Sequence, residues 1–485
     1  MMMRGRLGAV LSVAALLSAC GGGSSGGSGT GTVTVAPAAA PAATPTPTAS
    51  TGCSLRERQD WAAAQLQEWY LFPETLPTGL NPASYSTVSD YIDALTATAR
   101  SQRRDRYFTY LTSIASEDAY YSSGSSAGFG FRLSTNAAQR RVFIAESFEG
   151  SPALNAGIDR GAEILAVGTS ADDLRSVNDI IAASGTGGVT TALGPNSAGL
   201  TRVLRISDGA GTRTLTLAKA DYTLTPVSSR YGAKIIEDGG KRYGYVNLRT
   251  FISTADPALR QAFLNFRNAG ITQVVVDLRY NGGGLVSIAE LVGDLLGRDR
   301  SGGDVFSYTT FRPEKSANNK TRTFAAQPQS IAPTRLAFIG TGSTASASEL
   351  VINAMIPYLH ANAGLIGTNT YGKPVGQIAL DKPACDDRLR VIAFATQNAS
   401  RQGAYYDGLA TTVEASCQAG DDVTHPLGDP QEASTRAALD FLAGKACAPI
   451  GSAALSQSAR QAGEPRELLI PDRPDTAQRE VPGSF

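Results

Sequence analysis

The sequence predicts a multidomain α+β protein with an N-terminal helical segment, a small β domain and an α/β layered domain. The chain has 485 residues, enough for about two or three domains. The hydrophobic pattern changes character twice, which places the three expected regions at 53–118, 119–222 and 223–447. A hydrophobic content of 42% is typical of a globular protein, and the formal net charge of +0 gives no basic surplus for nucleic acid.

The first nineteen residues have the pattern of a bacterial export signal. Arg4 and Arg6 precede an apolar run at 7–17, which is too short to span a bilayer. Leu17-Ser-Ala-Cys20 then resembles a lipobox, so 1–19 is predicted to be a lipoprotein signal peptide and Cys20 the lipidated residue. Gly21 after the cysteine resembles lipoproteins sent to the outer membrane. The expected location is therefore the bacterial cell envelope, lipid-anchored at the outer membrane and facing the periplasm. An ordinary cleaved signal with a chance cysteine is the alternative.

The segment at 20–52 carries the lipidated cysteine and then consists almost entirely of Gly, Ser, Thr, Ala and Pro. Such a composition cannot bury enough apolar surface to offset its chain entropy. It predicts a flexible linker between the anchor and the folded part.

Four further cysteines follow the linker. An even number in an exported chain suggests two disulfides, and four cysteines allow three pairings. We expect Cys385–Cys417, closing one loop, and Cys53–Cys447, tying the start of the folded region to its end. Free buried thiols are the alternative. Because the chain has no C-x-x-C pair and no histidine cluster, we expect no metal site.

The region at 53–118 is expected to be helical. Trp61, Leu66 and Trp69 fall near helical spacing, and prolines then break the chain at Pro73 and Pro77. We interpret the aromatic stripe as a packing face rather than a binding platform.

The region at 119–222 contains strand-like runs separated by Gly and Ser clusters. Within it, Gly150-Ser-Pro-Ala-Leu-Asn-Ala-Gly-Ile158 and then Gly161-Ala-Glu-Ile-Leu-Ala-Val167 resemble the helix and strand of a PDZ domain, with Ala162 where that family usually has Asp. A generic small β domain is the alternative. Gly lets the backbone approach a ligand closely, and a strand edge accepts an added strand. The resemblance implies that the residues binding a peptide carboxylate are Gly128, Phe129, Gly130 and Phe131.

The region at 223–447 alternates buried strands with helices, which predicts a largely parallel sheet with active groups at its carboxyl edge. Two such groups are the segment Asp277-Leu-Arg-Tyr-Asn-Gly-Gly-Gly284, where Asp277 and Arg279 are expected to brace the Gly-rich loop, and the turn Thr341-Gly-Ser-Thr-Ala-Ser-Ala-Ser-Glu-Leu350. The polar remainder at 448–485 is expected to be a disordered tail.

The turn at 341–350 offers three candidate serine nucleophiles, Ser343, Ser346 and Ser348. Ser346 and Ser348 lie two positions apart, so only one of them can face a cleft on a helix. A serine at a helix N-terminus meets unpaired N–H groups and the positive end of the helix dipole. It also needs a base, and Tyr371-Gly-Lys-Pro-Val-Gly-Gln377 places one lysine in a Gly-flanked turn.

Together these motifs resemble the tail-specific, or C-terminal processing, serine peptidases that carry a PDZ domain, in their bacterial lipoprotein form. The resemblance implies a protease domain of the ClpP/crotonase type. It also implies Ser346 as nucleophile, Lys373 as base and Gln377 as its orienter, with the backbone N–H groups of Ala347 and Gly283 as oxyanion donors. Protein or peptide substrates with accessible C-termini follow as partners, with the membrane as partner through the lipid anchor and no nucleic acid, metal or cofactor.

A lysine acts as a base only when it is neutral, so its pKa must be lowered by burial. The uncharged neighbours of Lys373 suit such a pocket, and the Gln377 amide can accept from the amine without adding a negative charge. A catalytically inactive, peptide-binding lipoprotein with the same fold is the alternative function. A carrier of a retinoid or another small ligand is a third.

Overall fold

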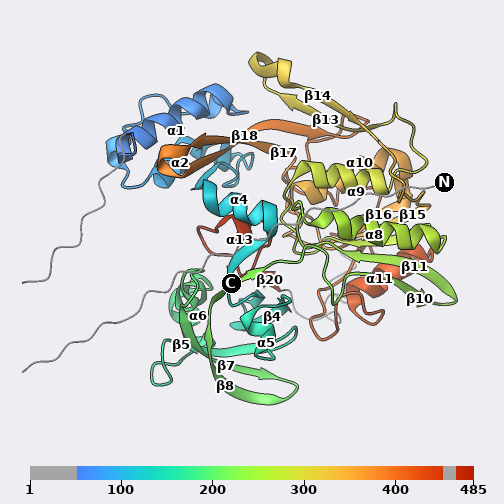
Figure 1. Ribbon diagram of the computed structural model, residues 1–485, viewed down its shortest axis with the longest axis horizontal. Coiled ribbons are helices and arrows are strands. Elements are labelled where there is room, and N and C mark those ends of the chain that lie inside the picture. The colour runs from blue at the N-terminus through green and yellow to red at the C-terminus, as the bar shows by residue number, and fades with distance from the viewer. Residues whose placement is uncertain (1–51, 452–465) are drawn as a thin grey trace, which may run out of the picture. The chain divides into compact units, whose positions relative to one another are not determined.

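The computed structural model describes residues 52–451 and 466–485, and residues 49–485 form one compact unit (Figure 1). The signal peptide, Cys20 and the linker up to residue 51 lie outside the described residues, so those expectations stay predictions. Within the described part of the chain, no helix combines the length and apolar character needed to cross a membrane. The coarse expectation of a multidomain α+β protein is confirmed.

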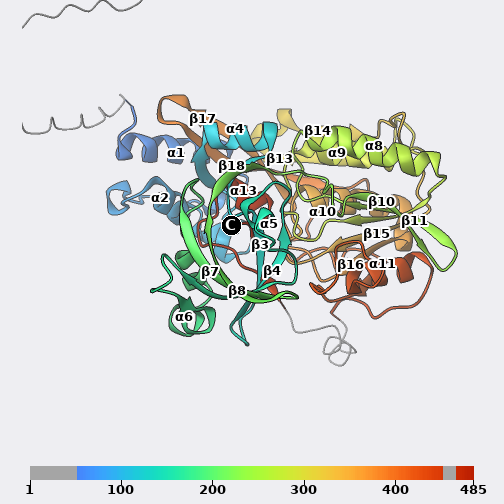
Figure 2. The same cartoon turned by 60° about the horizontal axis from the view of Figure 1, so that its bottom comes forward.

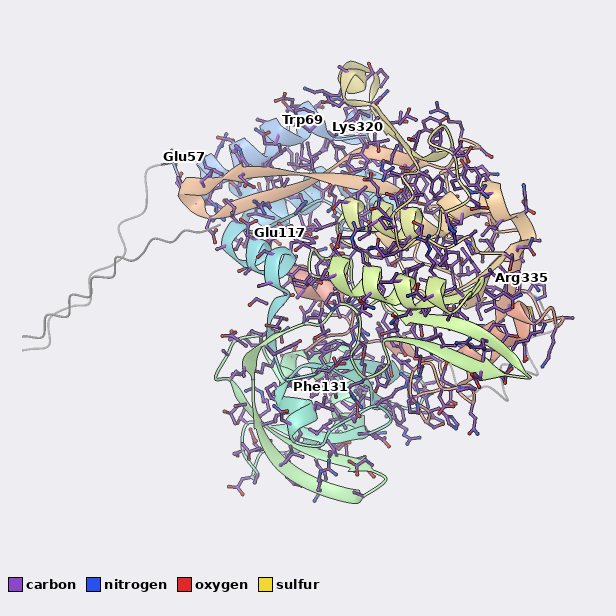
Figure 3. All side chains as sticks on the ribbon, turned by 45° about the vertical axis from the view of Figure 1, so that its right-hand side comes forward. Glu57, Trp69, Glu117, Phe131, Lys320 and Arg335 are labelled. Atoms are coloured by element: carbon purple, nitrogen blue, oxygen red, sulfur yellow. A yellow bond between two sulfur atoms is a disulfide. The ribbon has the colours of Figure 1, made fainter. Side chains whose placement is uncertain are left out.

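The N-terminal segment begins with helices that pack against a sheet of the third region. Ser54 caps the first helix, because its side chain and that of Glu57 exchange hydrogen bonds with each other's backbone N–H. Figure 3 labels Glu57 and Trp69 along this helix. Leu66 belongs to the same buried apolar cluster as Leu389. The helices are α1 (Leu55–Trp69), η1 (Pro73–Thr75), η2 (Pro82–Ser84), α2 (Val88–Leu95) and α3 (Ala97–Ser101).

The expected boundary at residue 118 falls inside a helix, α4 (Ile114–Ser123), which follows strand β1 (Tyr110–Ser113) directly. The boundary at residue 222 likewise falls inside β9 (Ala220–Thr223), which pairs with β2 (Ser125–Gly128). The chain therefore passes between regions through secondary structure rather than through linkers.

The second region is built on a sheet of strand order β3-β4-β5-β7-β8, with β6 paired to β5 and with β20 (Glu467–Leu468), from a later part of the chain, paired to β3. Its short helices α6 and α7 contribute Ile180, Val189 and Leu193 to one apolar core, which also contains Phe131 of β3 (Figure 3). The strands are β3 (Phe131–Asn136), β4 (Arg141–Ser147), β5 (Glu163–Gly168), β6 (Arg175–Ser176), β7 (Thr201–Asp208) and β8 (Gly211–Ala218). The helices are α5 (Pro152–Asn155), α6 (Val177–Ser184) and α7 (Gly187–Leu193).

The third region is built on a sheet of order β10-β11-β12-β15-β16-β19, parallel from β11 onward. Its strands are β10 (Ala233–Asp238), β11 (Lys241–Asn247), β12 (Gln273–Asp277), β15 (Arg335–Gly340), β16 (Ala363–Gly367) and β19 (Ala415–Gln418). Successive side chains of β12 enter different cores, with Val274 in one and Val275 in the other, because strand side chains alternate between faces.

Helices cover both faces of this sheet. Figure 2 shows α8 (Ala255–Asn268) and α9 (Val286–Leu295) on one side and α11 (Ala433–Leu442) on the other. Helix α10 (Ala347–Leu359) follows β15 directly and packs into the same core as α8 and α9.

A second, antiparallel sheet carries the lysine turn. Strand β18 (Asp387–Gln397) pairs with β1, β13 (Val305–Phe311) and β17 (Val375–Lys382), and β14 (Lys320–Thr323) adds to β13. The sequence indicated the strand at 389–396 but not this separate sheet. Because β1 comes from the N-terminal segment, that segment is an integral part of the sheet that holds Lys373.

The structure pairs Cys53 with Cys385 and Cys417 with Cys447, so both expected disulfide pairings are wrong. Cys385 lies in η5 (Pro383–Cys385) at the tip of the β17–β18 hairpin, where the hairpin reaches the start of α1. Cys417 lies in the edge strand β19. After α11 the chain returns to this strand, which brings Cys447 beside Cys417. Sequence distance alone does not reveal that the hairpin tip and β19 belong to different sheets.

The expectation of a disordered tail at 448–485 is wrong for residues 466–485, whereas residues 452–465 lie outside the described residues. Residues 466–485 form β20 (Glu467–Leu468) and α13 (Thr476–Glu480), and every residue from 481 to 485 is buried. Polar composition misled the prediction, because this segment is stabilised by the surfaces it contacts rather than by a core of its own.

Candidate active site

The Gly-rich segment 280–284 leaves the carboxyl end of β12 and is held by a buried ionic network. Arg279 donates to both oxygens of Asp277 at 3.0 Å and reaches both oxygens of Glu432 at 2.8 Å. Tyr245 donates its hydroxyl to Asp277 at 2.7 Å. The expectation that Asp277 and Arg279 brace the loop is confirmed.

Ser346 lies at the turn between β15 and α10, beside this segment. Ala345 N–H donates to the Asn281 carbonyl at 3.0 Å, which ties the two strand ends together. A Cβ added at Gly283 would stand 2.7 Å from the Ser346 Cβ, so only glycine permits this approach. Ser346 itself has φ +55° and ψ −116°, a backbone conformation that residues other than glycine rarely adopt.

The other two candidate serines have different surroundings. Ser348 is buried and donates its hydroxyl to the Asn281 carbonyl at 3.1 Å, so it braces the turn. Ser343 lies in the preceding loop and lines a cavity. Ser346 is therefore the serine at the N-terminus of α10.

Glu349 joins the serine turn to the lysine turn. Its buried carboxylate accepts from Ser346 N at 3.1 Å, from Gly372 N at 2.7 Å and from Lys373 N at 2.7 Å. One carboxylate oxygen, Oε2, receives both the Ser346 and the Lys373 N–H groups. The sequence-based prediction missed this role of Glu349, although a glutamate three residues after a helix N-cap is a recognisable capping signal.

Lys373 and Gln377 meet as expected. Lys373 Nζ donates to Gln377 Oε1 at 3.1 Å and lies 5.0 Å from the centre of the Phe108 ring. Burial lowers the pKa of the Lys373 ammonium, and the Glu480 carboxylate opposes that shift.

The N-terminal segment fixes the orientation of Gln377. The Gln377 amide nitrogen donates to the Phe108 carbonyl, which leaves its oxygen for the lysine. The loop around Phe108 is held by Asp105, whose Oδ1 accepts from Phe108 N at 2.8 Å and from Thr109 N at 3.2 Å. Tyr70 donates to Asp105 at 2.8 Å. Sequence reasoning missed these residues, since no local pattern links them to position 377.

The two expected oxyanion donors are placed differently. Ala347 is the first residue of α10, where backbone N–H groups point out of the helix end. The Gly283 N–H donates to Asn281 Oδ1 at 2.9 Å. The neighbouring Gly282 N–H donates to the carbonyl of Glu480 at 2.9 Å, so it is Gly282 that presents a donor to another peptide carbonyl.

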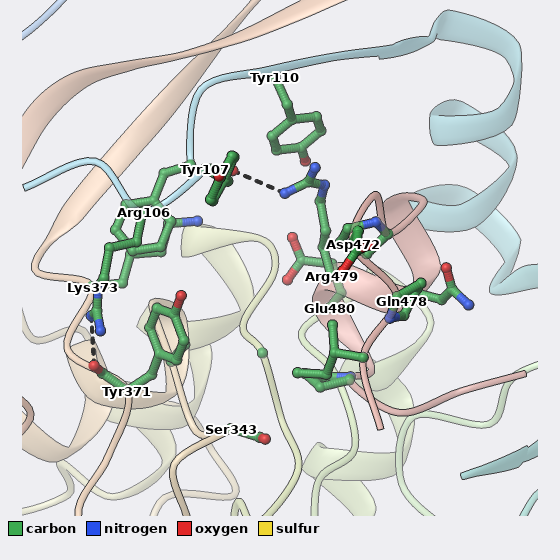
Figure 4. Close-up of a pocket in the computed structure, with 17 residues that line it drawn as sticks. Arg106, Tyr107, Tyr110, Ser343, Tyr371, Lys373, Asp472, Gln478, Arg479 and Glu480 are labelled. Carbon is green, nitrogen blue, oxygen red and sulfur yellow. Dashed lines mark hydrogen bonds between the residues drawn. The ribbon is translucent and has the colours of Figure 1, made fainter. Parts of the chain in front are cut away.

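A cavity of about 230 Å³ lies beside the lysine turn (Figure 4), and its lining includes Lys373 and Ser343 but not Ser346. Lys373 and Gly282 line it together with Arg106, Tyr107, Phe108 and Tyr110 of the N-terminal segment and several residues of 470–482. Arg106 donates to the carbonyls of Tyr371 and Gly372 at 2.6 Å, which holds the lysine turn from the other side.

The expected carboxylate-binding residues lie at the start of β3. Gly128 ends β2, and Phe129 and Phe131 are fully buried with their rings stacked at 5.3 Å. Gly130 N–H donates to the carbonyl of Phe485 at 2.8 Å. Within the described ranges, no group of three or more His, Cys, Asp or Glu side chains is arranged to hold a metal ion.

Residues 242–404 match peptidase family S41. The chloroplastic C-terminal processing peptidase of Tetradesmus obliquus is 29% identical over 270 residues, covering 53% of each chain. The carboxyl-terminal-processing protease of a Picosynechococcus species is 27% identical over 268 residues, covering 54% of this chain and 58% of the relative. This chain spans about half the length of the curated relatives it matches.

Among solved structures, a candidate S41 protease from Bacteroides fragilis NCTC 9343 superposes with a TM-score of 0.60 at 22% identity, covering 79% of this chain and 97% of that one. At that identity the superposition shows a shared fold. The sequence matches confirm the resemblance to the C-terminal processing peptidases. The chain therefore carries a domain of peptidase family S41, at residues 242–404.

Proposed function

We propose that this protein is a serine endopeptidase of the C-terminal processing type, with Ser346 as nucleophile and Lys373 as general base. The observation that carries the proposal is that one oxygen of the Glu349 carboxylate accepts hydrogen bonds from the backbone N–H groups of both Ser346 and Lys373. Desolvation lowers the pKa of Lys373, which favours the neutral amine that such a base requires. Gln377 orients that amine.

The reaction begins when neutral Lys373 takes the hydroxyl proton of Ser346 and the serine oxygen attacks the peptide carbonyl. Backbone N–H groups at Ala347 and Gly282 or Gly283 stabilise the oxyanion, a contribution of about 3 kcal/mol for each donor. The C–N bond then breaks, and the protonated lysine gives its proton to the leaving amine. Water, deprotonated by Lys373, hydrolyses the acyl-enzyme.

The test compares wild type with Ser346→Ala on an unfolded protein substrate, with Ser343→Ala as the matched control from the same turn. Cleavage and labelling by a serine-directed fluorophosphonate are expected to be lost in Ser346→Ala and kept in Ser343→Ala. Equal cleavage by wild type and Ser346→Ala would refute the proposal. Folded wild type that neither cleaves nor is labelled would favour the alternative, a peptide-binding protein without turnover.

The β domain at 119–222 is proposed to be a PDZ domain that recognises substrate tails. Its support is the edge of β3, to which residues 483–485 pair as an added strand ending at Gly130. Cleavage of the same substrate with a free and an amidated C-terminus tests the role of the carboxylate. Equal rates for the two substrates would remove carboxylate recognition and leave the peptidase.

We also propose that Cys20 anchors the protein to the bacterial envelope at the outer membrane. The support is the Leu17-Ser-Ala-Cys20 sequence with its basic and apolar flanks. Incorporation of labelled palmitate and membrane fractionation, compared between wild type and Cys20→Ser, test the anchor. Labelling that persists in Cys20→Ser would refute it.

A further inference from the structure

Residues 466–485 contact the edge of β3 twice and the cavity beside the lysine turn once between those two contacts. Leu469 N donates to the Leu133 carbonyl at 3.0 Å, and Leu133 N donates to the Gly483 carbonyl at 2.8 Å. The two ends of the segment therefore meet at one position of β3 and together form an interrupted antiparallel edge strand. The intervening residues 470–482 loop out over the site.

The Phe485 end of this segment is bound to β3 through its backbone and to the neighbouring core through its side chain. Phe485 N donates to the Phe131 carbonyl at 3.0 Å, and the Phe485 carbonyl accepts from Gly130 N at 2.8 Å. The Phe485 side chain is 2% exposed and belongs to the same apolar cluster as Val189 and Leu193 of α7. This is the way in which a sheet edge takes up an extended peptide with a large apolar residue at its end.

The looped-out part forms one wall of the cavity. Arg479 donates to the Tyr107 carbonyl at 2.9 Å and lies 3.8 Å from the centre of the Tyr110 ring, and Figure 4 shows it on the opposite side of the cavity from Lys373. The Glu480 carbonyl accepts a hydrogen bond from the Gly282 N–H. A Cβ added at Gly282 would come within 2.1 Å of the Arg479 carbonyl oxygen, so the segment lies on the bare backbone of the Gly-rich loop.

The backbone at the cavity is helical rather than extended. Arg479 N donates to the Asp475 carbonyl at 3.0 Å and Val481 N to the Ala477 carbonyl at 2.7 Å, as part of α13. A peptide folded into a helical turn does not present an extended scissile bond to the serine. The segment is therefore suited to cover the Gly-rich loop without being cut.

From this arrangement we propose that residues 466–485 are a built-in segment that occupies the β3 groove and forms a removable wall of the cavity beside Gly282 and Lys373. A protein chain presenting an extended peptide with a large apolar residue at the Phe485 position displaces it. Because both contacts belong to one short segment, displacement at β3 loosens the cover over Gly282 and Lys373. The inference rests on the proposed peptidase function for its catalytic consequence, whereas its binding consequence is independent of catalysis.

The binding experiment uses a fluorescent peptide that copies residues 466–485, added to the full chain and to a variant ending at residue 465. The shortened variant is expected to bind the peptide at least tenfold more tightly, because its groove is unoccupied. A peptide with Phe485→Ala is expected to bind at least tenfold more weakly than the parent peptide. Equal affinity of the full and shortened chains for the parent peptide would overturn the proposal.

The kinetic experiment measures kcat/KM on an unfolded protein for the same two chains. The shortened chain is expected to cleave at least tenfold faster, and added peptide is expected to inhibit it again. Equal rates for two folded, active proteins would overturn the proposal. If neither chain cleaves and neither is labelled at Ser346, the peptidase function fails, and the binding experiment still decides whether the segment occupies the groove.

Full-length variants cover the case in which the shortened chain does not fold. Phe485→Ala removes the buried anchor, and Glu467→Gln changes an exposed side chain of the same segment as the matched control. Faster amide exchange across 470–482 and several-fold faster cleavage are expected for Phe485→Ala alone. Unchanged exchange and cleavage in folded Phe485→Ala would overturn the proposal.

Discussion

The proposed role of Lys373 can be tested by placing a negative charge on its partner. Gln377→Glu keeps the shape of the side chain and puts a carboxylate where the amide oxygen now lies, 3.1 Å from Lys373 Nζ. Two unit charges at that 3.1 Å distance attract by about 5 kcal/mol when the effective dielectric constant is ~20. The attraction favours the protonated lysine, which cannot act as a base.

Part of this attraction is offset by the cost of burying the new carboxylate beside the Phe108 carbonyl. If about 3–4 kcal/mol remains, kcat/KM near neutral pH should fall by roughly 10²–10³-fold, since each 1.36 kcal/mol corresponds to a factor of ten. The rising limb of the pH–rate profile should move to higher pH, and the rate should recover toward that of wild type at alkaline pH.

The assay is a pH–rate profile of kcat/KM for wild type, Gln377→Glu and Gln377→Ala. Gln377→Ala removes the orienting contact without adding charge, so its rate should fall without an upward movement of the rising limb. Gln261→Glu, on the exposed face of α8, controls for the change in net charge. A rising limb at the same pH in wild type and Gln377→Glu would refute the assignment of Lys373 as base.

Three further predictions concern the groups that hold the site. Arg279→Lys cannot keep both hydrogen bonds to Glu432, so the free energy of unfolding in urea should fall by about 2–3 kcal/mol; an unchanged value would contradict a bracing role. Burial would raise the pKa of Glu432, but Arg279 outweighs it and lowers that pKa to about 2 from 4.5. The pair therefore stabilises the fold above pH 4.5, and about 3 kcal/mol should be lost as pH falls from 4.5 to about 2, as measured by acid titration of unfolding. Asp105→Ala should lower kcat about tenfold by releasing the loop that orients Gln377, whereas the exposed control Asp172→Ala should not.

The sequence predicted the central part of the fold because its signals are local. The apolar strands at 271–278 and 336–340 each end in a turn rich in small residues, and parallel neighbours must bring such turns to one edge. The structure places β12 beside β15 and joins their turns through Asn281. The contact between Lys373 and Gln377 was implied by the resemblance to the C-terminal processing peptidases rather than by a local pattern.

The parts that the sequence did not predict depend on contacts between distant segments. Cys385 pairs with Cys53 because a hairpin tip reaches the start of α1, and no local pattern encodes that reach. Phe108 orients Gln377 through a backbone carbonyl, a group that every residue carries and that leaves no mark in the sequence. Residues 466–485 look disordered by composition, yet Phe485 is buried in a core supplied by another region.

Displacement of the 466–485 segment has a consequence for the base itself. Burial is the main cause that lowers the pKa of Lys373, while Glu480 and Asp105 raise it and Arg479 and Arg390 lower it. When the segment leaves, Glu480, which raises this pKa, and Arg479, which lowers it, leave together, and water enters beside the lysine. Rehydration returns the amine toward its ordinary, protonated state. A bound substrate then has to exclude that water again, so the base becomes neutral when a peptide covers it and stays protonated when the cavity is open.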